Sequence, residues 1–129
     1  MTAPAASHVL MIAPHDYRTN AETAESNVFQ RAVTTTTAVR LAAQAERQHL
    51  RLRELLLAHG VRITVARALD TTPDAPFCNN WFSTHPALGT APPRLVLYPM
   101  LAPSRRLERR ADLIEMLARG YPAIVDLSS

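Results

Sequence analysis

The fold is decided by residues 36–65, which read TTAVRLAAQAERQHLRLRELLLAHGVRITV. Positions 41, 45, 48, 52 and 55 or 56 step by three and four and are mostly apolar, which is the spacing of one helix face. Gly60 stands where a left-handed residue ends a helix, and residues 61–65 alternate as a strand does. The stretch therefore predicts an amphipathic helix over residues 36–59, followed directly by a strand.

The segments on either side add further strands and a second helix. The run HVLMI at residues 8–12 predicts a buried strand, and a short helical piece is predicted within residues 22–29. Residues 77–84 and 94–98 read as a hairpin with a long tip, helical spacing follows from 107 to 118, and residues 123–127 form a last strand. The order β-α-β-β-β-α-β predicts a mixed α/β fold with a mixed sheet, not a doubly wound parallel one.

Composition excludes several classes of protein. The chain has 129 residues, 47% of them hydrophobic and 19% charged, which is typical of one soluble globular domain. All 14 basic residues are arginine, but the net charge is only +3 and they are scattered, so a solvated surface explains them better than phosphate binding does. No apolar run approaches the roughly 18 to 20 residues that span a bilayer. We expect neither a nucleic-acid nor a membrane partner.

Cysteine and histidine usage argues against disulfide and metal chemistry. Cys78 is the single cysteine, and no secretory signal opens the chain, so a cytoplasmic location is expected. The five histidines and Cys78 show no pair at metal-ligand spacing, and no phosphate-binding or dinucleotide-binding glycine loop is present. The sequence therefore predicts no metal and no cofactor.

The densest polar stretch is PDAPFCNNWFSTH at residues 73–85. Asn79 and Asn80 are poor strand formers, so two interpretations stand, a turn that begins the hairpin or a binding site. Cys78 is either a nucleophile or a small buried side chain, and the sequence favours burial because it places no base beside the thiol. His85 precedes a proline and fits a turn residue better than a general base.

Four arginines, at positions 105, 106, 109 and 110, open the predicted second helix. Positive charge at a helix N-terminus opposes the helix dipole, so these residues are not placed there for helix stability. They form either a charged face screened by Glu108 and Asp112, or a site in which one arginine binds a carboxylate in a bidentate way.

Several blocks along the chain together resemble one group of enzymes. The blocks are NAETA (20–24), NVFQ (27–30), TPDAPFCNNWFSTH (72–85), LYPM (97–100) and APSRRLERR (102–110). They resemble arginine-deiminase-related proteins, including the citrulline-hydrolase branch, of the guanidino-group-modifying (pentein, amidinotransferase) superfamily. The resemblance implies a five-bladed α/β propeller of ββαβ units. Residues 1–129 would supply about two of the five, as the N-terminal portion of a single domain.

The resemblance also assigns substrate-binding residues. A Pro-Asp-x-x-Phe-x-Glu-Asp block holds the substrate in related hydrolases, and here it implies Asp74 together with Asn79 and Asn80 in place of the acidic pair. The Ala-Pro-Ser-Arg-Arg turn implies that Arg105 binds the carboxylate of the substrate. An amide at position 80 suits a neutral ureido group, which favours citrulline over arginine.

The catalytic groups of these relatives are expected elsewhere. Their nucleophilic cysteine, with its glutamate and histidine, would lie beyond residue 129, so no catalytic residue is assigned here and Cys78 is not the nucleophile. The sequence predicts a hydrolase that acts on C–N bonds of small arginine-like or citrulline-like amino acids by a covalent thiolate mechanism. Residues 1–129 alone are expected to be inactive and to self-associate through open strand edges. The alternative is a non-catalytic pentein-like binding module.

Overall fold

The computed structural model describes residues 6–24 and 35–128. The chain forms two compact units, Met1–Pro76 and Phe77–Ser129, and each has helices and a sheet of its own. The mixed α/β class is confirmed. Within the described residues, no helix combines the length and apolar character that crossing a bilayer requires. That residues 1–129 belong to one domain stays a prediction.

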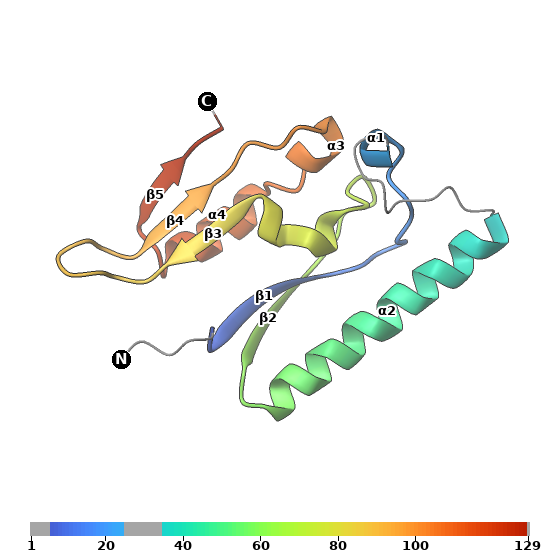
Figure 1. Ribbon diagram of the computed structural model, residues 1–129, viewed down its shortest axis with the longest axis horizontal. Helices are drawn as coiled ribbons and strands as arrows, with labels where there is room; N and C mark the ends of the chain where they lie inside the picture. Colours follow the sequence, from blue (N-terminus) through green and yellow to red (C-terminus); the bar gives the residue numbers. More distant parts are fainter. Residues whose placement is uncertain (1–5, 25–34, 129) are drawn as a thin grey trace. The chain divides into compact units, whose positions relative to one another are not determined.

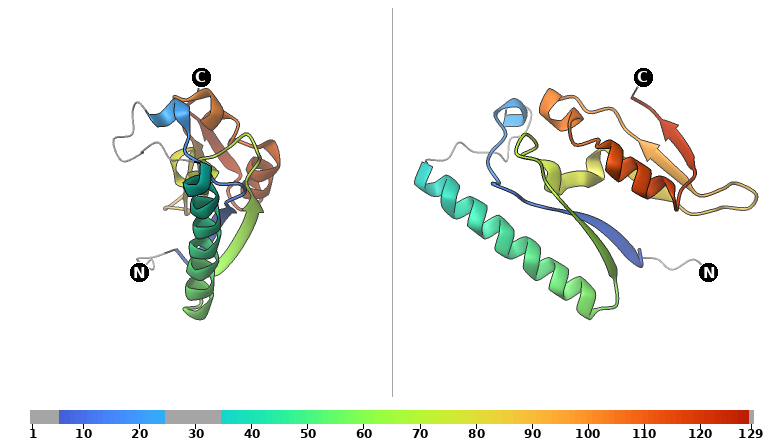
Figure 2. Two further views of the ribbon diagram at one scale, coloured as in Figure 1. Left: turned by 90° about the vertical axis from the view of Figure 1, so that its right-hand side faces the viewer. Right: turned by 180° about the vertical axis from the view of Figure 1, so that it is seen from behind.

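The first unit is built on two parallel strands, β1 (His8–Ala13) and β2 (Arg62–Arg67), paired residue by residue along their length. Parallel strands need a long crossover, and α1 (Ala21–Ala24) and α2 (Thr35–Ala58) lie within it. The predicted strands and long helix are thus confirmed, while residues 25–29 of the predicted short helix lie outside the described residues. In Figures 1 and 2, α2 runs alongside the β1–β2 pair.

The end of α2 follows the prediction closely. Gly60 has a φ of 77°, the left-handed conformation that glycine adopts without steric cost. His59 Nδ1 lies 2.7 Å from the carbonyl oxygen of Leu55, which also accepts the backbone N–H of His59 at 3.1 Å, so the imidazole adds a second contact at the helix end. The chain therefore turns directly from α2 into β2.

The covered face of α2 differs from the prediction. Gln48, Leu52 and Leu55 are exposed, and the partly covered positions run instead through Leu41, Ala45, His49, Arg53 and Leu56. A helix that lies over only two strands covers a narrow stripe, and long arginine stems can line such a stripe as well as leucine. The apolar spacing located the helix and is right at Leu41, Ala45 and Leu56, but at positions 48 and 52 the covered side chain is that of the next residue.

The second unit holds a three-stranded sheet in the order β3-β4-β5. Strands β3 (Phe82–His85) and β4 (Arg94–Leu97) are antiparallel, and β5 (Ala123–Asp126) pairs with β4 in parallel, which confirms the hairpin and the mixed sheet. Helix α4 (Ala111–Ala118) covers one face, behind the sheet in Figure 1 and in front of it in the right-hand view of Figure 2. The chain order is ββααβ, which differs by one short helix from the ββαβ order that the resemblance implied.

The predicted strand over residues 77–84 is wrong in its first half. Residues Ala75–Asn80 form a 3₁₀ helix, η1, with a kink at Phe77, and the strand begins only at residue 82. Pro76 has no N–H to give to a sheet, and adjacent asparagines favour turns over strands. The backbone N–H of Trp81 donates to the carbonyl of Cys78 at 3.3 Å, so the turn continues up to the fully buried Trp81.

The predicted second helix is two separate helices. Helix α3 (Pro103–Arg106) begins with proline, α4 begins at Ala111, and Arg110 between them is extended with φ −76° and ψ 134°. The prediction that the arginines open one long helix is therefore wrong. Arg105 and Arg106 end a one-turn helix, where positive charge complements the helix dipole.

Candidate functional site

A buried carboxylate, that of Asp74, is the centre of a polar cluster in the first unit. Its Oδ2 accepts a hydrogen bond from Asn20 Nδ2 at 2.8 Å and lies 3.2 Å from the hydroxyl of Thr23. Asp74 and Asn20 are both buried although they stand 54 residues apart in the chain. The fold of the first unit therefore gathers these side chains, because no local structure could join them.

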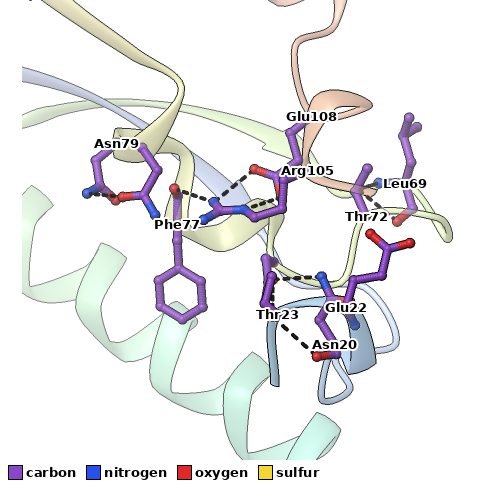
Figure 3. A network of polar contacts seen from close by, with 11 residues as sticks. Asn20, Glu22, Thr23, Leu69, Thr72, Phe77, Asn79, Arg105 and Glu108 are labelled. Carbon is purple, nitrogen blue, oxygen red and sulfur yellow. Dashed lines mark hydrogen bonds and ion pairs between the residues drawn. The ribbon is translucent and has the colours of Figure 1, made fainter. Parts of the chain in front are cut away.

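The start of α1 fixes the donors that face Asp74. Asn20 is the residue before α1, and its Oδ1 accepts the backbone N–H of Glu22 at 3.1 Å, which caps the helix. The same amide then has its nitrogen left for Asp74. Thr23 follows in the same turn of α1, and Figure 3 shows it beside Asn20. A short capped helix thus presents two neutral donors to one carboxylate.

The loop that leads to Asp74 is held from within. The hydroxyl of Thr72 accepts the N–H of Leu69 and lies 3.0 Å from the carbonyl of the same residue, and it is buried. The N–H of Ala75 then donates to the Thr72 carbonyl at 3.2 Å. These bonds fix the backbone on both sides of Asp74 without using its side chain.

Within the described residues of the first unit, the Asp74 carboxylate has only neutral hydrogen-bond partners. Among the described residues of that unit, no arginine or lysine pairs with it. Burial, and after it the negative charge of Asp74, raises the pKa of Tyr17 above its usual value, because both disfavour a phenolate. Burying a carboxylate without a counter-ion is costly, so the cluster is electrostatically suited to a cation supplied by a ligand.

A second buried carboxylate, Glu108, dominates the second unit. Arg105 donates two hydrogen bonds to it, from Nε to Oε1 at 3.0 Å and from Nη2 to Oε2 at 3.1 Å, as Figure 3 shows. The Glu108 side chain is 1% exposed and that of Arg105 is 12% exposed. Nη2 of Arg105 also donates to the backbone carbonyl of Phe77 at 3.1 Å.

Arg105 does bind a carboxylate in the bidentate way that the sequence suggested, but the carboxylate is that of Glu108. The guanidinium uses Nε and both hydrogens of Nη2 in these contacts. Among the described residues of the second unit, Nη1 has no hydrogen-bond partner. One nitrogen with two N–H groups therefore remains for a ligand.

The other three arginines are held differently. Arg106 donates to the carbonyls of Met100 and Leu101 at 2.9 and 3.1 Å, so it braces the turn before α3. Arg109 pairs with Asp126 and Arg110 with Asp112, and both of these carboxylates are largely exposed. Arg109 and Arg110 thus pair with more exposed carboxylates, whereas Arg105 pairs with a buried one.

Asn79 and Asn80 lie together at the end of η1. Both are exposed, and Asn79 Nδ2 donates to Asn80 Oδ1 at 3.0 Å. Because Arg105 bonds to the carbonyl of Phe77 in the same short helix, the structure brings Arg105 to the segment that carries both amides. Cys78 is buried, as the sequence favoured.

His85 belongs to a separate polar group on the hairpin. Its Nε2 lies 2.8 Å from the hydroxyl of Ser83, which in turn lies 2.7 Å from the hydroxyl of Tyr98. His85 is exposed at the end of β3, so it is a strand residue bordering the hairpin tip. Among the described residues, no group of three or more potential ligands is placed to hold a metal ion.

Sequence reasoning missed three members of the two clusters. Asn20 and Thr23 precede and open a helix, and this capping pattern was the signal that both side chains would be fixed. Glu108 follows Arg105 by three residues, but it was interpreted only as a screen for several arginines. Of the four predicted binding residues, Asp74 lies in the first unit and Asn79, Asn80 and Arg105 lie in the second.

The comparison with protein families identifies one family. A model of the family described as "N,N dimethylarginine dimethylhydrolase, eukaryotic" matches residues 13–129. The chain belongs to this family. The dimethylarginine dimethylhydrolase match spans both clusters and confirms that the resemblance pointed to the right superfamily of guanidino-modifying proteins. No curated protein and no solved structure matches the chain.

Proposed function

We propose that the protein is a hydrolase that cleaves the bond between the guanidino carbon and the methylated nitrogen of a methylated arginine. Water supplies the oxygen that becomes the ureido oxygen on the amino acid. The methylated amine leaves and takes up the hydrogens of that water. Membership in the dimethylarginine dimethylhydrolase family supports this substrate class. The alternative, a pentein-like module that binds without chemistry, has no contact that favours it.

The observation that carries the proposal is the buried charge of Asp74. Among the described residues of the first unit this carboxylate meets an amide and a hydroxyl and no cation, and a guanidinium offers the planar, charged donors that would balance its charge. Asp74 would therefore hold the guanidino end of the substrate. Glu108 is a poor candidate for this role because its charge is already matched by Arg105.

The remaining assignments follow from chemistry and exposure. Arg105 would bind the substrate carboxylate through Nη1, the nitrogen that its contacts in the second unit leave over. Asn79 and Asn80 would contact the guanidino or ureido group, because their amides are exposed and each offers a donor and an acceptor. The amide at position 80 favours a neutral substrate such as citrulline, whereas the charge of Asp74 favours a cationic one such as methylated arginine.

Cys78 is not proposed as the nucleophile. A thiolate needs access to the substrate and a group that lowers its pKa, and Cys78 is buried in a short helix. The covalent mechanism, with its cysteine, histidine and glutamate outside residues 1–129, stays a prediction that rests on the resemblance. Replacement of Cys78 by alanine is expected to leave turnover in the protein unchanged.

The test is the release of dimethylamine from dimethylarginine by the whole protein that contains residues 1–129 and by two isosteric variants of it. Asp74→Asn removes the buried charge, and Asp112→Asn removes an exposed carboxylate of the same type. A charge-assisted hydrogen bond contributes about 1.5 to 3 kcal/mol, so Asp74→Asn should lower kcat/KM by about ten- to a hundredfold. Asp112→Asn should have no effect.

Two results would contradict the proposal. Equal kinetics for Asp74→Asn and the unchanged protein would remove Asp74 from the guanidino end. Saturable binding of dimethylarginine without any amine release, in the whole protein that contains residues 1–129 and with its fold intact, would favour the non-catalytic module.

A further inference from the structure

We propose that Glu108 is a positioning residue, which holds Arg105 so that Nη1 faces the carboxylate of the substrate. The inference rests on the proposed function, because it assumes that the ligand carries a carboxylate. It concerns a residue that never touches the substrate and acts only through Arg105.

The geometry of the pair orients the guanidinium completely. Two parallel hydrogen bonds from Nε and Nη2 fix both the plane and the rotation of the guanidinium, which a single bond would not do. The carbonyl of Phe77 takes the second hydrogen of Nη2, and this contact leaves Nη1 as the remaining donor among the described residues of the second unit. An arginine is normally flexible, so this fixation reduces the entropy lost when a ligand binds.

The backbone holds Glu108 itself in place. Its N–H donates to the carbonyl of Arg105 at 3.2 Å, so the turn that ends α3 sets the spacing between the two side chains. The carboxylate is almost fully buried and the guanidinium keeps a small exposed part. The buried Glu108 carboxylate therefore stays fixed in the interior, and the Arg105 guanidinium that it holds is the group that reaches solvent.

The electrostatic role of Glu108 is separate from its geometric one. A guanidinium that is nearly nine-tenths buried needs a counter-ion before any ligand arrives, and Glu108 supplies it. Another arginine pair of the same unit shows the contrast, because Arg119 and Glu115 are 3.6 Å apart with both side chains more than three-quarters exposed. Such an exposed pair does not fix the orientation of the Arg119 guanidinium, so Glu115 provides a matched control for Glu108.

The experiment measures binding with two probes, dimethylarginine and its analogue in which hydrogen replaces the carboxylate. Calorimetry is done on the protein and on Glu108→Gln, Glu115→Gln and Arg105→Gln. Glu108→Gln should weaken dimethylarginine binding by about tenfold or more and leave the analogue unchanged, since an unmatched polar contact costs about one order of magnitude in affinity. Glu115→Gln should change neither probe.

A double variant, Arg105→Gln with Glu108→Gln, tests whether Glu108 acts only through Arg105. It also replaces the ion pair by two neutral amides, so it remains usable if Glu108→Gln alone does not fold. Its affinity for dimethylarginine should equal that of Arg105→Gln. A weaker affinity in the double variant would show a separate effect of Glu108 and overturn the inference.

The failures are distinguishable. If Glu108→Gln weakens both probes equally, Glu108 is merely structural and the inference is wrong. If the protein binds both probes with equal affinity, or binds neither, Arg105 does not bind the carboxylate of the substrate and the inference is again wrong. If the carboxylate-dependent loss is found but no amine is released, the inference holds and the proposed hydrolase function fails.

Discussion

Asp74 in the first unit and Glu108 in the second are both buried carboxylates, yet their surroundings differ in charge. Asp74 accepts hydrogen bonds from an amide and faces a hydroxyl, whereas Glu108 accepts two from the guanidinium of Arg105. Burial by itself therefore does not distinguish a binding carboxylate from a supporting one. The charge of the partner does, because only an unmatched carboxylate gains free energy from a cationic ligand.

The largest expected effect is on stability, and it separates the two carboxylates directly. Glu108→Gln leaves a buried guanidinium without its counter-ion and should lower the free energy of unfolding by about 3 kcal/mol. Asp74→Asn removes an unmatched charge while an amide oxygen can still accept from Asn20, so the change should stay within about 1 kcal/mol. Urea unfolding of both variants, followed at several protein concentrations to detect self-association, measures the difference.

Equal losses of stability in the two variants would break this comparison. Such a result would mean that Asp74 gains as much from its neutral donors as Glu108 gains from an ion pair. The buried charge would then no longer indicate a site for a cation.

A smaller effect is expected on substrate choice. Asn80→Asp adds a second carboxylate for a guanidinium to meet, but it places acceptor against acceptor when the substrate carries a ureido oxygen. An unmatched contact costs roughly 1 to 3 kcal/mol, so the ratio of kcat/KM for dimethylarginine over citrulline should rise by about tenfold or more. Both substrates are measured in one buffer, with Asn79→Asp as the neighbouring control.

An unchanged ratio in Asn80→Asp, with the fold intact, would place Asn80 outside direct contact with the substrate. The argument for citrulline would then have no support in the chain, and the charge of Asp74 would be the remaining guide to the substrate.

The smallest effect is on the titration of Tyr17. Burial raises the pKa of Tyr17 first, and the negative charge of Asp74 raises it further. Asp74→Asn should therefore lower the pKa of Tyr17 part of the way toward its ordinary value, because burial remains. Ultraviolet titration of the phenolate measures this, with Tyr98 and Tyr121 replaced by phenylalanine.

The sign of the linked stability follows from the raised pKa. The neutral form of Tyr17 is favoured in the folded state, so this contribution to stability is complete below the ordinary pKa of about 10 and is lost as the pH rises through the raised value. If Asp74→Asn left the pKa of Tyr17 unmoved, the carboxylate would not carry the charge that the comparison with Glu108 assumes.

The sequence by itself determined the elements whose signals are local. The spacing over residues 36–59 located α2, Gly60 marked its end, and the alternating runs located the strands, because period and turn preference depend on neighbours in the chain. It also predicted the mixed class and the buried state of Cys78. It misplaced the start of β3 and joined α3 to α4, since a pattern of apolar residues does not show where a backbone turns.

Only the tertiary structure decided which partners the buried carboxylates have. The sequence showed Asp74 beside a proline and Glu108 among arginines, and nothing local distinguished their roles. Asp74 meets Asn20 across 54 residues, and Glu108 selects Arg105 from four nearby arginines through the turn at the end of α3. The partner of Asp74 depends on which distant side chains folding brings within about 3 Å, and the partner of Glu108 depends on which of the nearby arginines the turn after α3 brings to it.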